Sequence, residues 1–111
     1  MALPDIVANS DRQKIVQIAH SILDGSISII AAARQLRAFA GGHAGIDERD
    51  PDFRTFVGID SETDDLPVGE TRRHWAADAL AKKDVEIARC EDLYRDAARE
   101  AAARLITRYS Q

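Results

Sequence analysis

The sequence predicts an all-α protein, a compact bundle of about five helices that ends in a long C-terminal helix. Apolar residues recur at spacings of three and four along most of the chain, and no segment shows the strict alternation of a strand. Glycines and prolines fall between the apolar segments, where they begin or end helices. The chain has 111 residues, of which 45% are hydrophobic and 31% charged. This length predicts a single domain over residues 1–111, and this composition is typical of a globular protein.

The first two helices are predicted to form an antiparallel hairpin. Ser10 is the expected N-cap of the first helix, and Gly25 is expected to end it. Residues 1–9 before this cap are either flexible or a helical extension. The second helix starts a few residues later, and this short connection favours antiparallel packing. A glycine-rich loop over residues 41–50 follows.

The third helix has the clearest start signal in the chain. Asp50 supplies an acidic N-cap, and Pro51 suits the first helical position. Phe53 and Phe56 are expected to anchor this helix in the core. Asp60 falls on the same face at helical spacing, so the sequence predicts an inward-facing carboxylate at this position.

The C-terminal part is predicted to be helical from Glu70 almost to the end, with a break or bend near residues 82–84. A short heptad-like seam steps along its second half at intervals of four, three and four. This seam fits either the core of the bundle or the interface of a homodimer. Its members are Tyr94, Ala98, Ala101 and Leu105.

Charge is distributed unevenly along the chain. Residues 47–70, here called the acidic strip, hold nine acidic and two basic residues, a local net charge of −7, whereas the chain from Thr71 onward holds nine basic and seven acidic residues. Such a strip repels phosphate backbones and attracts basic surfaces. We therefore expect a basic protein as the partner, and no nucleic acid.

Two roles are predicted within the acidic strip. Asp60 is expected to form a bidentate ion pair with Arg72 on the next helix, which would hold the two helices together. The other acids would then be free to pair with cations of a partner. The residues predicted to bind the partner are Glu48, Asp52, Glu62 and Asp65.

A divalent-metal site is the alternative interpretation of the same segment. Asp60, Glu62 and Asp64 resemble the first, third and fifth positions of a calcium-binding loop. The comparison then fails, because Asp65 stands where such a loop needs glycine and Thr71 where it needs a bidentate glutamate. A looser magnesium site built from these three carboxylates stays open.

The remaining motifs point to no catalytic residue and no cofactor. The chain lacks the phosphate-binding, dinucleotide-binding and serine-hydrolase motifs, and its histidines do not have metal-ligand spacing. Cys90 is the single cysteine, so no internal disulfide is possible. The first ten residues do not resemble a signal peptide, and no apolar stretch is long enough for a membrane span. These features predict a cytoplasmic location for the protein.

The run from Ile59 to Gly69, followed by Arg72, Trp75 and Lys83–Ile87, resembles a pattern in small uncharacterised bacterial helical proteins. The upstream segments Ile22–Gly25 and Ala33–Leu36 fit the same family. Short acidic helical proteins of this kind are often immunity partners of secreted toxins. The resemblance implies a helical fold and a bacterial cytoplasm, and it carries no catalytic residue.

The sequence therefore favours a small cytoplasmic protein-binding module, of the inhibitor or immunity type, whose acidic strip neutralises a basic partner. One alternative is a structural or regulatory homodimer formed through the C-terminal helix. The other is a divalent-metal-dependent enzyme that uses the carboxylates of residues 60–65.

Overall fold

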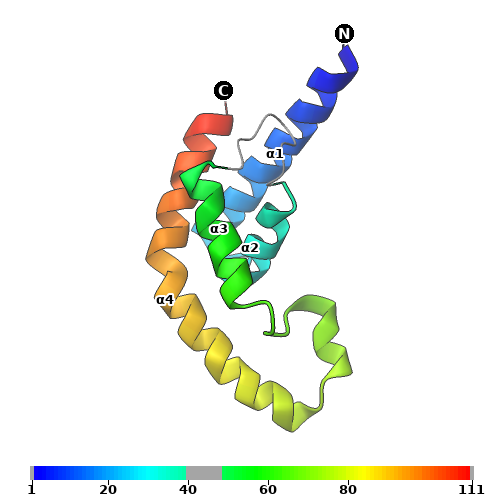
Figure 1. The fold of residues 1–111 in the computed structure, drawn as a ribbon, viewed down its shortest axis with the longest axis vertical. Coiled ribbons are helices and arrows are strands. Elements are labelled where there is room, and N and C mark those ends of the chain that lie inside the picture. Colours follow the sequence, from blue (N-terminus) through cyan, green and yellow to red (C-terminus); the bar gives the residue numbers. More distant parts are fainter. Residues whose placement is uncertain (1, 40–48, 111) are drawn as a thin grey trace.

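The computed structural model describes residues 2–39 and 49–110, with side chains described from residue 10 onward. These residues form four α-helices and one 3-10 helix: α1 (Ala2–Asp24), α2 (Ile29–Arg37), α3 (Pro51–Glu62), the 3-10 helix η2 (Gly69–His74) and α4 (Ala77–Tyr109). The described part of the chain contains no strand (Figure 1). The all-α prediction is confirmed.

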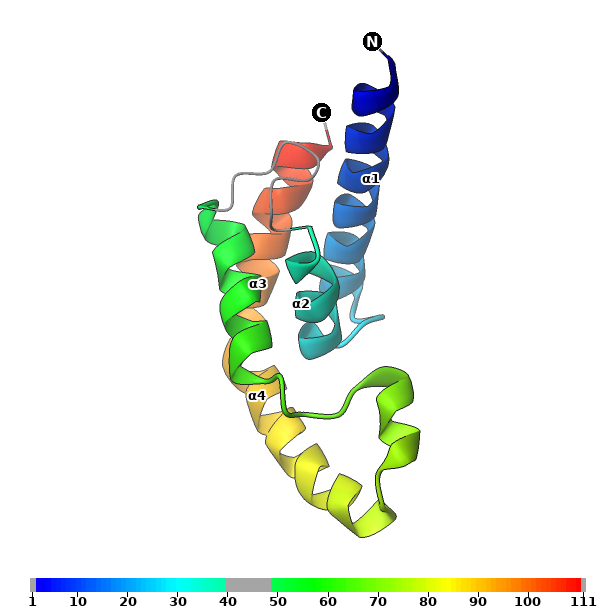
Figure 2. The ribbon, with the colours of Figure 1, turned by 45° about the vertical axis from the view of Figure 1, so that its right-hand side comes forward.

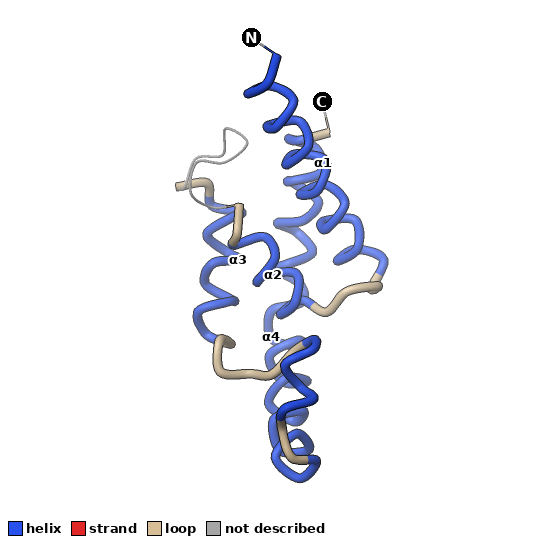
Figure 3. Tube along the Cα trace, turned by 90° about the vertical axis from the view of Figure 1, so that its right-hand side faces the viewer, coloured by secondary structure: helices blue, strands red, loops and turns tan. Residues whose placement is uncertain are grey.

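The four α-helices run alternately down and up the molecule. α1 and α3 descend, α2 and α4 ascend, and the two chain ends lie at the same end of the bundle (Figures 1 and 2). α1 and α2 thus form the predicted antiparallel hairpin. The molecule measures 53 × 27 × 24 Å, because α4 and η2 extend well beyond the other helices, as the side view of Figure 3 also shows.

The core lies between α1, α2, α3 and the second half of α4. Phe53 and Phe56 are fully buried, as the sequence predicted. The face of α4 that enters the core is mostly alanine, which permits close approach of the other helices. The fully buried residues of α4 are Ala98, Ala101, Ala102 and Leu105.

The predicted helix ends are largely confirmed. Gly25 follows α1 with a φ of 80°, a left-handed conformation that favours glycine. The Asp50 carboxylate accepts hydrogen bonds from the backbone N–H groups of Asp52 (2.9 Å) and Phe53 (3.3 Å) at the start of α3. α1 begins at Ala2 and not at Ser10, so the N-terminal residues are a helical extension.

The segment around residues 70–84 differs from the prediction. No α-helix starts at Glu70, because η2 occupies Gly69–His74, and Trp75 and Ala76 have extended backbones before α4 begins. α4 is continuous through residues 82–84, where a break was predicted. Asp84 lies inside α4, and its carboxylate pairs with Arg72. Most of the predicted loop over residues 41–50 lies outside the described residues.

Candidate functional site

Asp60 is buried on α3, with 6% of its surface exposed, as the sequence predicted. Its partners, however, come from α2: Arg37 Nη1 lies 2.7 Å from Oδ2, and Arg34 Nε lies 3.4 Å from Oδ1. The predicted pair of Asp60 with Arg72 is therefore wrong. Arg34 and Arg37 are three residues apart on one face of α2, and that face packs against α3.

Arg34 also closes the C-terminal end of α3. Its Nη2 donates hydrogen bonds to the carbonyl oxygens of Thr63 (2.5 Å) and Leu66 (2.6 Å). Carbonyl groups at the C-terminal end of a helix have no hydrogen-bond donor within the helix. A guanidinium group there donates to them, and its positive charge interacts favourably with the negative end of the helix dipole. The inward carboxylate of Asp60 thus belongs to a junction between α2 and α3.

Arg72 serves a second junction, between η2 and α4. Its Nη1 and Nη2 lie 2.7 and 3.0 Å from the two carboxylate oxygens of Asp84, and Nη1 also donates to the Pro67 carbonyl (3.2 Å). The hydrogen bond from Arg72 lowers the pKa of Asp84. Lys83 adds two longer contacts, each 3.4 Å, to Asp65 and Glu86.

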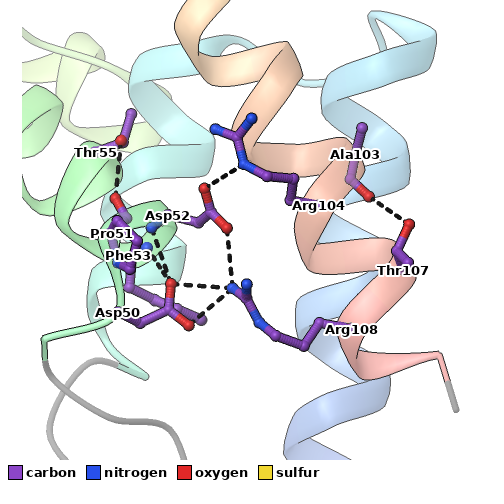
Figure 4. Close-up of polar contacts among 9 residues, drawn as sticks. All are labelled: Asp50, Pro51, Asp52, Phe53, Thr55, Ala103, Arg104, Thr107 and Arg108. Carbon is purple, nitrogen blue, oxygen red and sulfur yellow. Dashed lines mark hydrogen bonds and ion pairs between the residues drawn. The ribbon is translucent and has the colours of Figure 1, made fainter.

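Asp52 was predicted to face a partner protein, and this prediction is wrong. The residue is only 1% exposed, and its carboxylate lies between two arginines of α4 (Figure 4). Arg104 Nε is 2.8 Å from Oδ1, and Arg108 Nη2 is 3.0 Å from Oδ2. Arg108 also pairs with the helix cap Asp50 at 2.8 Å. The first turn of α3 faces α4, so a carboxylate here meets residues one turn apart on that helix.

Sequence reasoning missed these arginines, although their spacing carried a signal. Arg34 and Arg37 are three residues apart, and Arg104 and Arg108 are four apart. Two cations on one helix face can hold one buried carboxylate between them. Asp52 directly precedes Phe53, which could have marked it as a boundary residue.

Two further charged side chains of α4 close the ends of other helices. The Glu91 carboxylate accepts hydrogen bonds from the N–H groups of Ile29 and Ile30, both at 2.8 Å, at the start of α2. Arg99 donates to the Leu23 carbonyl at the end of α1, at 2.9 Å. Both placements agree with the helix dipole, which favours a carboxylate at an N-terminus and a cation at a C-terminus. Charged residues of α4 therefore hold α1, α2 and α3.

Among the acids of the strip that the structure describes, four are exposed, and we call them the exposed acidic patch: Glu62, Asp64, Asp65 and Glu70. Two of them, Glu62 and Asp65, were predicted to bind a partner, whereas Glu48 lies outside the described residues. Asp65 has the long contact to Lys83. The other three make no ion pair with any described residue.

Two neighbours help to place this patch. Burial and the charge of Glu62 both raise the pKa of Tyr94, which places Glu62 near α4. Trp75, which directly follows η2, is 37% exposed.

The alternative metal site at Asp60, Glu62 and Asp64 is wrong. Asp60 turns toward the arginines of α2, whereas Glu62 and Asp64 face solvent. Among the side chains of residues 10–39 and 49–110, no three acidic, histidine or cysteine groups gather as ligands for an ion.

The heptad-like seam of α4 contributes to the core of the bundle. Ala98, Ala101 and Leu105 are fully buried, and Tyr94 packs against the core while partly exposed. A homodimer through this seam would have to displace α1 or α3. Of the two interpretations left open by the sequence, the intramolecular one is correct.

None of the described helices is both long and apolar enough to cross a lipid bilayer. Comparisons with protein-family models, with curated proteins and with solved structures found no match to this chain.

Proposed function

We propose that this protein is a binding module of the inhibitor or immunity type, which acts in the bacterial cytoplasm on a protein with a basic surface. The observation that carries the proposal is the exposed acidic patch. Three of its four carboxylates, those of Glu62, Asp64 and Glu70, have no cationic partner among the described residues, although the chain is rich in arginine.

The contrast with the other acids of the strip supports this role. Asp50, Asp52 and Asp60 are held by arginines and hold the helices together. The four acids of the patch lie after these, at the end of α3 and on the segment leading through η2. Carboxylates that are exposed and unpaired raise the local negative potential, which speeds encounter with a basic surface and fixes its orientation.

Trp75 is suited to be the apolar anchor of such an interface. It follows η2, which carries Glu70, and it is one of three large hydrophobic residues that are exposed in the described part of the chain. Tryptophan is among the residues that contribute most to binding when a partner covers them. A cationic surface with a shallow apolar pocket matches this arrangement.

The first test is binding to the product of the adjacent gene, because immunity proteins are commonly encoded beside their toxins. The two chains are co-expressed and purified, and their affinity is measured by calorimetry at low and at physiological salt. We expect a complex whose affinity falls as salt rises, because salt screens interactions between exposed charges.

A pair of charge-neutralised variants identifies the surface. The patch variant carries Glu62→Gln with Glu70→Gln, and the control carries Asp78→Asn with Glu100→Gln, two exposed acids of α4 that make no ion pair with any described residue. Both change the net charge equally. We expect the patch variant to bind at least about tenfold more weakly and the control to bind within about threefold of the original protein. Equal losses in the two variants, or no complex at all, would contradict the proposal.

A further inference from the structure

The N-terminal half of α4 is a long helix with few internal contacts. None of residues 77–97 is buried. η2 with its flanking segment lies along one side (Figures 1 and 3), and near the end of this stretch Glu91 contacts the start of α2 and Tyr94 packs against the core. Two of the three large exposed hydrophobic residues lie here, Val85 (64% exposed) and Leu93 (69%). A helix this polar and this exposed is weakly stable without further contacts.

The charged residues on one side of this helix are paired within the chain, whereas several on the other side are not. On the covered side, Lys83 and Asp84 pair with other segments of the chain. On the open side, Lys82, Arg89 and Asp96 are exposed and make no ion pair with any residue that the structure describes. The open side therefore presents uncommitted charges of both signs around two exposed apolar residues.

These residues lie on one face of the helix and are arranged symmetrically on either side of Arg89. At about 100° per residue, Val85 and Leu93 lie roughly 80° apart around the helix, with Arg89 midway between them. Lys82 and Asp96 are each seven residues from Arg89, in opposite directions, and Val85 and Leu93 are each four residues from it. A two-fold axis at Arg89 would bring each position opposite its counterpart.

We infer that this face binds a second copy of the chain, with the two α4 helices antiparallel. In that arrangement Lys82 of one copy lies opposite Asp96 of the other, and Val85 opposite Leu93, and each contact occurs twice. The two Arg89 side chains meet at the axis, where Glu86 and Asp92 of the opposite copy flank them. A parallel pairing would instead place Lys82 against Lys82 and Asp96 against Asp96, and like charges opposite each other disfavour it.

This interface does not use the exposed acidic patch, so the inference is independent of the proposed function. One helix pair is at the small end of specific interfaces, about 1,200 Å² in total, so we expect a roughly micromolar dimer. Sedimentation velocity between about 0.1 and about 500 µM should show mostly monomer at the low end and dimer at the high end. Monomer throughout this range would overturn the inference.

A charge exchange tests the register. Lys82→Glu should weaken the dimer about tenfold, because it sets two acids opposite each other twice. The double variant Lys82→Glu with Asp96→Lys restores opposite charges and should return to within about threefold of the original dissociation constant. Lys14→Glu on α1, an equal change at another exposed lysine, is the control and should have no effect. A double variant as weak as the single one would contradict this register.

Cross-linking tests the orientation in a Cys90→Ser background. Val85→Cys and Leu93→Cys proteins are mixed and oxidised. We expect a mixed disulfide dimer to form several-fold faster than either self-dimer, because like positions lie about 12 Å apart along the axis in the antiparallel arrangement. Faster self-dimers would show that the helices do not pair in this way. Both positions are exposed, so neither change removes a core contact.

Discussion

The cluster around Asp52 gives the sharpest test of how this fold is held together. Its side chain is 2% exposed, whereas the side chains of its two partners, Arg104 and Arg108, are 57% and 41% exposed. Removing the acid leaves two arginines that can turn to water. Removing both arginines leaves a buried carboxylate that cannot reach water. We therefore expect the two changes to differ greatly in cost.

The magnitudes follow from this difference in burial. Asp52→Asn loses charged hydrogen bonds but leaves no buried charge, so it should lower the free energy of unfolding by about 1–2 kcal/mol. The variant Arg104→Met with Arg108→Met leaves Asp52 buried without a cation, and it should lose about 3–5 kcal/mol. Adding Asp52→Asn to that double variant removes the unpaired charge and should recover about 1–3 kcal/mol.

Urea denaturation followed by circular dichroism measures all four proteins, with unfolding free energies taken at pH 7. The decisive observation is the order of stability: the triple variant should exceed the double arginine variant although it carries one more substitution. If the triple variant is the less stable of the two, the buried charge of Asp52 does not need its arginines for stabilisation, and the reasoning is refuted.

Three further predictions test other parts of the molecule. Glu91→Ala should lower stability by about 1–2 kcal/mol and speed amide hydrogen exchange at Ile29 and Ile30 more than elsewhere in α2, because their N–H groups lose their acceptor. The carboxyl of Asp84 should titrate by NMR below its usual pKa and return toward it in Arg72→Gln, so any stability from this pair is present above the unfolded-state pKa and is lost as pH falls through the lower folded value. Trp75→Ala should weaken partner binding by about thirtyfold and lower the melting temperature only slightly, because the part of the side chain that is covered by the protein is lost as well.

The fold could largely be predicted because periodicity and helix-end residues are local signals. The cap at Asp50, the stop at Gly25 and the apolar face of Phe53 and Phe56 each depend on neighbours within a few residues, and the structure confirms them. The error at residues 70–84 has a tertiary cause. Arg72 reaches Asp84 twelve residues on, and this contact accompanies a 3-10 turn and an extended linker where propensity alone favours helix.

The site was harder to predict because ion pairing depends on which helices are neighbours. The sequence could show that Asp60 points inward, but the choice between Arg72 and Arg37 requires knowing that α2 packs beside α3. In the same way, the acid content of residues 47–70 was visible, whereas the burial of Asp52 against α4 was not.

The use of charge in the structure explains why a count of acids overstates the surface available to a partner. An acid at a helix start or on an apolar face is drawn into the fold, since an arginine on a neighbouring helix can neutralise it and the helix dipole favours it there. Asp50 and Asp52 meet these conditions at the start of α3. Acids at a helix end, such as Glu62, oppose the dipole and have no comparable reason to be held inside. The exposed acidic patch therefore lies where the chain leaves α3, and its net charge acts outward on whatever approaches that end of the bundle.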